Sequence, residues 1–308
     1  MTRLAVFTDL DGTLLNSNQQ LSDINRQTLT SLGKAGICRI VATGRSLYSA
    51  QRVLDDAFPI DYLISSTGAS VSTFPQSRLL RTVAMTSDEV QESVATLLEL
   101  ALDFMIQDPV PHNHCFAWHA NSQPNPDFER RVALYDAHQR PLVLPLNDPT
   151  PATQLLAISS ADAGERLQRT LQTRLPKLTV IRTTSPLDHH STWLEIFPGN
   201  VSKSKTARWL CGELNLDTRQ IATIGNDYND IDLLEWGAYS YVVGNAPEDL
   251  RDQFTPVSRH DDNGFTEAIN RWLVHSSGSL PRYPSLDKSH PFRRGRRGKK
   301  PRLGGLFQ

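Results

Sequence analysis

Residues 3–14 read Arg3-Leu4-Ala5-Val6-Phe7-Thr8-Asp9-Leu10-Asp11-Gly12-Thr13-Leu14, an apolar run that ends in two acids and a glycine. A short apolar run bounded by an Asp-Gly turn is typical of a buried strand. Ser22 can then cap a helix that ends near Gly36, and 37–42 is a second apolar, β-branched run. Strand, helix and strand at this spacing predict a parallel β-α-β unit.

The same alternation returns late in the sequence. Strands are predicted at 193–197, 220–224 and 238–243, and helices at 202–214, 230–236 and 265–274. The segment between the two halves differs in character. Thr86 and Glu89 form the capping box of a predicted helix, and 108–126, rich in Pro, His and Asn, is predicted to be irregular.

The fold class that follows is α/β, with a doubly wound, Rossmann-like parallel-sheet core and an inserted α/β cap domain. We expect four parts: the first core half at 1–82, the cap or substrate-specificity domain at 83–186, the second core half at 187–275, and a disordered basic tail at 276–308.

The composition excludes several classes of protein. Hydrophobic residues make up 39% of the 308 residues, yet no uncharged apolar run approaches the ~18 residues of a spanning helix. Asp9 comes too early for the apolar region of a secretory signal. The three cysteines, Cys38, Cys115 and Cys211, lie far apart without metal-ligand spacing, which predicts reduced thiols. We therefore expect a cytoplasmic protein with no membrane partner.

The net charge of −1 combines an acidic body with a basic tail. Residues 276–308 hold nine of the 32 Lys and Arg residues but only one acid, Asp287. Such a tail could bind a nucleic acid or another polyanion by electrostatics. The acidic body and the scarcity of aromatic residues in the tail favour a solvated extension instead.

The two acids after the first predicted strand carry the sharpest chemical signal. Asp9 and Asp11 are two residues apart, so in an extended chain both carboxylates point to the same side. Like charges in one small volume destabilise each other unless a proton or a cation intervenes. A solvated turn is the alternative, but sites form at the carboxyl ends of parallel strands.

A second acidic cluster, Gly225-Asn226-Asp227-Tyr228-Asn229-Asp230, follows another predicted strand. A helix cap needs one such residue, whereas this turn has four. If both clusters meet at one sheet edge, their oxygens suit a hard cation, Mg²⁺ before Ca²⁺ where a phosphate adds further ligands.

Two more segments suit a phosphate. Lys203 and Lys205 lie in the first turn of a predicted helix, where two cations oppose the helix dipole unless an anion binds there. Thr43-Gly44-Arg45 follows a strand and offers a hydroxyl and free backbone amides.

Together, these four segments resemble the ordered motifs of the haloacid dehalogenase superfamily of phosphotransferases. Asp9–Leu14 matches the first motif, Thr43–Arg45 the second, Lys203 the third and Gly225–Asp230 the fourth. More narrowly, the chain looks like the Cof-type phosphatases, which carry a large α/β cap between the second and third motifs. The resemblance covers about residues 3–275, through motifs in the core halves and through length and rhythm in the cap.

The resemblance implies a role for each matching residue. Asp9 would attack phosphorus and form an aspartyl-phosphate, and Asp11 would act as general acid and base. Thr43, Gly44 and Lys203 would hold the phosphate, whereas Lys205 lies outside the motif position. The implied cofactor is Mg²⁺, and its implied ligands are Asp9, Asp11, Asn226, Asp227 and Asp230.

The sequence departs from the family pattern after Gly225, where Asn226 stands in the place usually held by Asp. An amide oxygen can ligate Mg²⁺ but brings no charge. Either Asn226 is the direct Mg²⁺ ligand, with Asp230 behind it, or Asp227 takes that ligand position instead. Thr67, more often Asn in this group, is a lesser departure.

The resemblance implies a phosphatase that hydrolyses a small phosphorylated metabolite, such as a sugar phosphate or related phosphomonoester. A phosphosugar mutase is the alternative within the superfamily, because the motifs do not determine whether water or a sugar hydroxyl accepts the phosphoryl group. A non-catalytic polyanion-binding module that uses the basic tail is the other alternative.

Histidines gather in the predicted cap, where His112, His114 and His119 lie near Trp118. Their spacings match no helix or strand template for a transition-metal site, so a loop is the favoured interpretation. Because caps close over active sites, Asp108, His112, His114 and Trp118 are hypothesised to line the substrate pocket.

Overall fold

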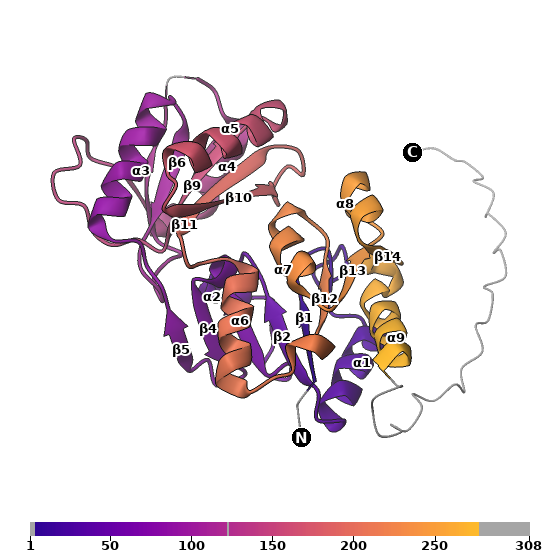
Figure 1. Ribbon diagram of the computed structural model, residues 1–308. Coiled ribbons are helices and arrows are strands. Elements are labelled where there is room, and N and C mark those ends of the chain that lie inside the picture. The colour runs from indigo at the N-terminus through magenta and orange to yellow at the C-terminus, as the bar shows by residue number, and fades with distance from the viewer. Residues whose placement is uncertain (1–3, 122, 277–308) are drawn as a thin grey trace, which may run out of the picture.

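The computed structural model describes residues 4–121 and 123–276 and contains two β-sheets (Figure 1). The larger sheet has the order β14-β13-β12-β1-β2-β3-β4-β5. Its strands are β1 (Ala5–Thr8), β2 (Cys38–Ala42), β3 (Tyr62–Ser65), β4 (Ser70–Thr73), β5 (Leu79–Thr82), β12 (Ala222–Gly225), β13 (Tyr239–Val243) and β14 (Thr255–Val257). All neighbours up to β3 are parallel, and β4 and β5 add an antiparallel edge.

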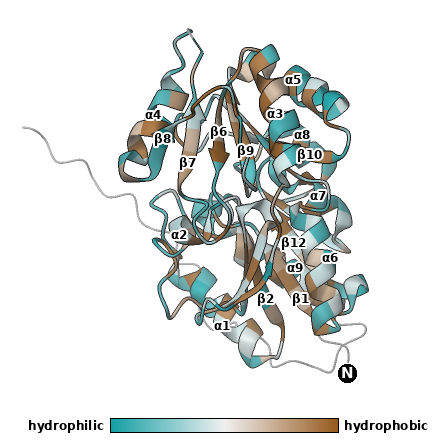
Figure 2. Ribbon diagram, turned by 90° about the vertical axis from the view of Figure 1, so that its left-hand side faces the viewer, coloured by the Kyte–Doolittle hydropathy of each residue, from teal (hydrophilic) through white to brown (hydrophobic). Residues whose placement is uncertain are grey.

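Helices cover both faces of this sheet, as predicted for a doubly wound core. Alternate residues of β1 point to opposite faces: Val6 packs in the cluster that includes α1 and α9, and Phe7 in the cluster that includes α6 and α7. The helices of this part are α1 (Asp23–Lys34), α2 (Leu47–Ala50), α6 (Lys203–Leu214), α7 (Ile231–Trp236), α8 (Glu248–Gln253) and α9 (Gly264–Ser276). Figure 2 shows the hydrophobic colour concentrated along β1 and β2, between the helix layers.

The predicted helix at Ser22 is present as α1, and the Ser22 hydroxyl accepts a hydrogen bond from the Asn25 amide. The large apolar side chains of α1 are only partly buried: Leu29 and Leu32 pack in the core, but Ile24 is 50% exposed.

The smaller sheet has the order β10-β11-β9-β6-β7-β8 and is antiparallel except for the pair β7 and β8. Its strands are β6 (Asp103–Gln107), β7 (Phe116–His119), β8 (Gln139–Pro141), β9 (Gln154–Ser159), β10 (Leu178–Thr184) and β11 (Thr192–Pro198). One apolar cluster contains residues of α3 (Ser87–Glu99) and α5 (Ala161–Arg174) together with this sheet. A second cluster contains Phe128 of α4 (Pro126–Leu134). The capping box predicted at Thr86 and Glu89 is present.

Two predictions about this region are wrong. The strand predicted at 193–197 is β11, which pairs with β9 and β10 and so belongs to the smaller sheet, not to the core half predicted from 187. An apolar run indicates that a strand is buried, but not which sheet it joins. The stretch 108–126, predicted to be irregular, contains the four-residue strand β7.

The predicted disordered tail lies outside the described residues, apart from the end of α9. Among the helices of the described part, none is long and apolar enough to cross a lipid bilayer.

Candidate active site

Three predicted site segments meet at one edge of the larger sheet. Asp9 follows β1, Thr43 follows β2, and 226–230 follow β12, and these three strands are parallel neighbours. A backbone hydrogen bond joins β1 to β12 at this edge, where the Asp9 amide donates to the Ile224 carbonyl at 2.9 Å. The fourth segment reaches the same edge through Lys203, the first residue of α6.

Lys203 is the centre of the site and is fully buried. Its Nζ donates to Asp9 Oδ1 at 2.7 Å and to Asp230 Oδ1 at 2.6 Å. Burial by itself lowers the pKa of the Lys203 ammonium, but the carboxylates of Asp230 and Asp9 outweigh burial and hold that pKa above its usual value. The ammonium therefore stays charged between two carboxylates.

Asp9 is only 6% exposed. Burial raises the pKa of Asp9 to about 7, although the Lys203 ammonium opposes this and the Asp230 charge adds to it. Two buried carboxylates share one ammonium, so the group carries an excess of negative charge when both are ionised. A proton or a metal cation at Asp9 would balance that excess.

The carboxylates of Asp9 and Asp11 bind different cationic side chains. Whereas Asp9 pairs with Lys203, Asp11 accepts from Arg45 Nε and Nη2 at 2.7 Å each. Gly12 makes possible the turn that directly follows Asp11. Its φ is +70°, and a Cβ there would lie 2.8 Å from Asn226 Nδ2.

The loop after β12 places Asn226, and not Asp227, beside Asp9. One end of the Asn226 amide lies 3.2 Å from Asp9 Oδ2, 3.2 Å from the Asp11 carbonyl oxygen and 2.9 Å from Thr13 Oγ1. With nitrogen at that end, the amide donates to these oxygens. With oxygen there, it faces the oxygens of Asp9, Asp11 and Thr13 with no cation among the four, and such carboxylate, carbonyl and amide oxygens are the donors that Mg²⁺ prefers. The residues therefore fit a Mg²⁺ ion.

The Asp227 carboxylate is turned toward the smaller sheet, so the structure does not bring this predicted ligand to the cluster. It accepts from Thr183 Oγ1 at 2.9 Å, from the Thr184 amide at 2.8 Å and from Thr184 Oγ1 at 3.1 Å. It also accepts from the Tyr228 amide at 2.8 Å. These contacts tie the loop to the end of β10.

Asp230 lies behind Asn226, as one of the two predicted alternatives requires. While its Oδ1 holds Lys203, its Oδ2 accepts from the backbone amides of Asn226 at 2.9 Å and Asp227 at 3.2 Å. The fully buried Asp230 thus fixes both the backbone of the 226–230 loop and the position of the Lys203 side chain.

The predicted phosphate-binding residues Thr43 and Gly44 line the same edge. Thr43 is only 1% exposed, and its hydroxyl accepts a hydrogen bond from the Arg45 amide at 3.1 Å. A Cβ added to Gly44 would lie 3.6 Å from Thr67 Oγ1 and 3.7 Å from Asn229 Nδ2. Lys205, by contrast, points away from the cluster and bonds Thr179 Oγ1 and the Gly199 carbonyl.

Sequence reasoning gave no role to two residues that border the site, Arg45 and Glu195. The buried Glu195 of β11 accepts from Thr67 Oγ1 and from Gln154 Nε2, each at 3.1 Å, and so links the smaller sheet to the core. Burial raises the pKa of Glu195. An acid inside the apolar strand of 193–197 was the available signal, because a buried charge needs partners.

Of the four residues hypothesised to line a pocket from the cap, only His114 is seen to contact a core ring. Its ring stacks on that of Tyr48 with 4.1 Å between centroids. Asp108 pairs with Arg140, and Trp118 donates to Gln139. The cap does touch the core nearby, since Asn113 Nδ2 donates to Ser66 Oγ at 2.6 Å.

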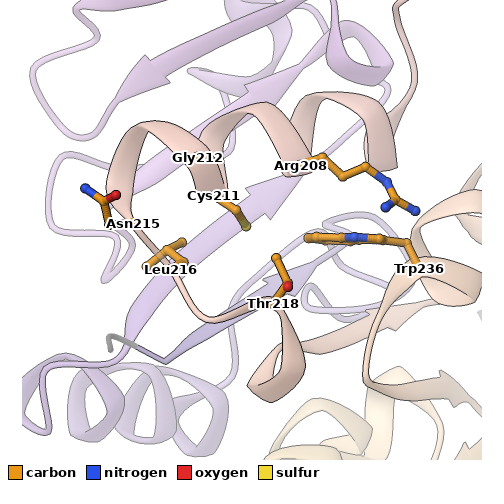
Figure 3. A pocket seen from close by; sticks show the side chains of 7 residues that line it. All are labelled: Arg208, Cys211, Gly212, Asn215, Leu216, Thr218 and Trp236. Carbon is orange, nitrogen blue, oxygen red and sulfur yellow. The ribbon is translucent and has the colours of Figure 1, made fainter. Parts of the chain in front are cut away.

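A surface hollow of about 460 Å³ lies elsewhere and holds none of these residues. Figure 3 shows Arg208 stacked over Trp236, with Cys211 between the helix and the ring; the hollow is also lined by Gly212, Asn215, Leu216 and Thr218. No carboxylate lines it, so the chemistry is assigned to the sheet edge and not to this hollow.

Comparison with known proteins identifies the family of the chain. The family model described as haloacid dehalogenase-like hydrolase matches residues 6–269. The chain is 26% identical to "Putative phosphatase YxeH" of Bacillus subtilis, over 86% of this chain and 97% of that protein. It is 27% identical to an "HMP-PP phosphatase" of Escherichia coli, over 89% and 96%. The solved "HAD Subclass IIB Sugar Phosphatase BT4131" superposes with a TM-score of 0.68 at 18% identity, over 87% and 98%.

Proposed function

Because this chain belongs to the haloacid dehalogenase-like hydrolase family, we propose that it is a Mg²⁺-dependent phosphatase that acts on a small phosphorylated metabolite. One observation carries the proposal: the buried triad of Asp9, Lys203 and Asp230. Lys203 fixes Oδ1 of Asp9, and the other oxygen is left toward Asn226 at the sheet edge. A carboxylate oriented in this way is suited to attack phosphorus.

The proposed reaction has two steps. Asp9 Oδ2 bonds to phosphorus and the bond from phosphorus to the substrate oxygen breaks, while Asp11 gives that oxygen a proton. A water then attacks the aspartyl-phosphate, giving its proton to Asp11 and releasing inorganic phosphate and free Asp9. Thr43, Gly44 and Lys203 would hold the oxygens of the transferring group.

Asp9, the main-chain carbonyl of Asp11 and Asn226 would hold the Mg²⁺ ion, with Asp230 behind them. When bound, the ion supplies positive charge that offsets the charge of the phosphoryl oxygens. Asp227 is left out of the proposed ligand set because its carboxylate already accepts four hydrogen bonds.

We assign substrate selection to the smaller sheet and its helices, which would act as a cap. Three contacts support this: Asn113 to Ser66, Glu195 to Thr67, and Asp227 to Thr183 and Thr184. A relative named as an HMP-PP phosphatase and a solved structure named as a sugar phosphatase support a small phosphorylated metabolite, such as a sugar phosphate, as the substrate class.

The test is phosphate release from p-nitrophenyl phosphate and a panel of phosphorylated metabolites, with Mg²⁺ or with EDTA. The expected result is Mg²⁺-dependent turnover that Asp9→Asn abolishes. Asp55→Asn is the matched control, because Asp55 pairs with Arg26 on the surface.

Turnover that survives in Asp9→Asn would contradict the assignment of the nucleophile. Folded native protein that releases no phosphate, but moves the phosphoryl group between hydroxyls of one sugar, would make the chain a phosphosugar mutase.

A further inference from the structure

A second group of metal-ligating side chains lies in the cap, apart from the carboxylates of the sheet edge. It consists of His114, Cys115 and His138, whose ligand atoms all lie within 4.8 Å of one another. All three residues are partly buried. Of the histidines that the sequence brought together, only His114 belongs to this group; His119 packs on Phe104 instead.

The register of two strands brings the group together from positions far apart in sequence. Phe116, the first residue of β7, pairs with Gln139, the first residue of β8, in a parallel ladder. Cys115 and His138 each precede one of these residues, so they lie side by side at the start of adjacent strands, which run about 4.8 Å apart. The distance between Cys115 Sγ and His138 Nδ1 is 3.8 Å.

The loop that carries His114 and Cys115 is fixed on several sides. Its two ends are joined by the hydrogen bond from the Asp108 amide to the Cys115 carbonyl at 2.9 Å. The Asp108 carboxylate is held by Arg140 of β8. Such contacts set the direction of ligands before any ion binds, as the supporting residues of protein metal sites do.

One aromatic ring from outside the group, that of Tyr48, contacts both of its histidines. The His114 and His138 rings meet edge to face, with centroids 4.8 Å apart, and Tyr48 of α2 stacks on His114. Since Tyr48 belongs to the core, the group lies where cap and core meet.

The chemistry of the three ligands is specific. Imidazole nitrogen and thiolate sulfur are borderline and soft donors, which suit Zn²⁺ and similar transition ions rather than Mg²⁺. In a tetrahedral Zn²⁺ site, bonds of about 2.3 Å to sulfur and 2.0 Å to nitrogen separate the two donors by about 3.5 Å. The observed 3.8 Å therefore needs only a small adjustment.

We propose that His114, Cys115 and His138 form a second metal site, which binds one divalent transition ion of the Zn²⁺ class through two imidazoles and one thiolate. A water completes the tetrahedron. The site is independent of the phosphatase assignment, because it shares no residue with the sheet edge.

Co²⁺ tests the site directly, since four-coordinate Co²⁺ bound by a thiolate gives strong visible bands and a near-ultraviolet charge-transfer band. The full chain is titrated in excess Mg²⁺, which occupies the carboxylates of the sheet edge. The expected result is one Co²⁺ bound per chain with both bands, and their disappearance when Zn²⁺ displaces it. Cys115→Ala removes the charge-transfer band, and His138→Gln weakens Co²⁺ binding at least about tenfold, a loss of about 1.4 kcal/mol.

Matched controls keep the result interpretable. Cys211→Ala and His119→Gln change the same residue types outside the group and should leave both bands intact. Circular dichroism and the melting midpoint verify that each variant folds. Native protein without the bands, or Cys115→Ala with both bands unchanged, would overturn the proposal.

Discussion

Arg45 holds the carboxylate of Asp11 at two points, with Nε to Oδ2 and Nη2 to Oδ1 each at 2.7 Å. A planar guanidinium on a carboxylate fixes the direction of the acid as well as its place. Both oxygens of the proposed general acid are occupied in this arrangement. Asp11 must therefore release at least one of the two bonds before it can pass a proton to a leaving group.

Arg45→Lys should lower kcat about tenfold, because a lysine ammonium is a point charge and cannot hold Asp11 in one orientation. The measurement is steady-state kinetics on the best substrate of the panel, with the pH profile of kcat. Arg26→Lys changes the same residue type in a surface pair with Asp55 and should leave kcat unchanged. Equal kinetics for Arg45→Lys and the native protein would refute a positioning role for Arg45.

Lys203→Met should lower the free energy of unfolding by about 3–5 kcal/mol, because it leaves two buried carboxylates without their shared cation. Lys205→Met is the matched control two residues away; Lys205 lies at the surface, so it should change stability by less than about 0.5 kcal/mol. Urea denaturation measures both. A second change, Asp230→Asn, should restore part of the loss, and no recovery would argue against the electrostatic explanation.

The pKa of Asp9, raised to about 7 from an ordinary value of 3.8, predicts how the metal-free protein responds to pH. The folded state binds a proton at Asp9 more tightly than the unfolded state. The Asp9 contribution to stability is thus fully present below pH 3.8 and is lost as pH rises through about 7. Denaturation in EDTA at several pH values should show this decline for the native protein and not for Asp9→Asn; parallel curves would contradict it.

Mg²⁺ bound at Asp9, as proposed, would displace that proton, so the affinity for Mg²⁺ should increase over the same pH range. Calorimetric titration of the native protein at each pH measures this. An affinity that does not change with pH would mean that Asp9 is not a ligand.

Asn226→Asp should tighten Mg²⁺ binding about tenfold or more, because it adds a charge beside Asp9 Oδ2 and the Asp11 carbonyl. Asp227→Asn should change the affinity by less than about twofold, since its carboxylate faces Thr183 and Thr184. Calorimetric titration with Mg²⁺ compares the two variants. A larger effect at Asp227 than at Asn226 would reverse the proposed ligand assignment.

The core and its acidic edge could be predicted from the sequence because their signals are local. The run 4–7, shortly before Asp9, is apolar without interruption, and parallel strands place their carboxyl ends together, which predicts that Asp9, Thr43 and Asp230 converge. The departure at Asn226 was also visible in the sequence. Which of Asn226 and Asp227 lies beside Asp9 was not, because that depends on Thr183 and Thr184 of another sheet.

The smaller sheet was harder to predict because its signals depend on tertiary pairing. The strand β7 has four residues and lies among polar ones, so it has too little pattern to detect alone. The sequence predicted β11 as a strand but placed it in the wrong sheet, because an apolar pattern shows that a strand is buried and not which strands it pairs with. The proximity of Cys115 and His138 follows from the pairing of Phe116 with Gln139, which no local pattern encodes.

Thr183 and Thr184 of β10 donate hydrogen bonds to the Asp227 carboxylate. The short loop 226–230 is therefore in contact with both the larger and the smaller sheet. The same loop carries Asn226 and Asp230, so a displacement of the smaller sheet would be passed to the residues that surround the proposed nucleophile Asp9. Substitutions in β10 can then retune the rate of the reaction without touching a reacting group. Substrate preference and rate would then change together in such a protein, because residues 226–230 make hydrogen bonds both to β10 and within the proposed site.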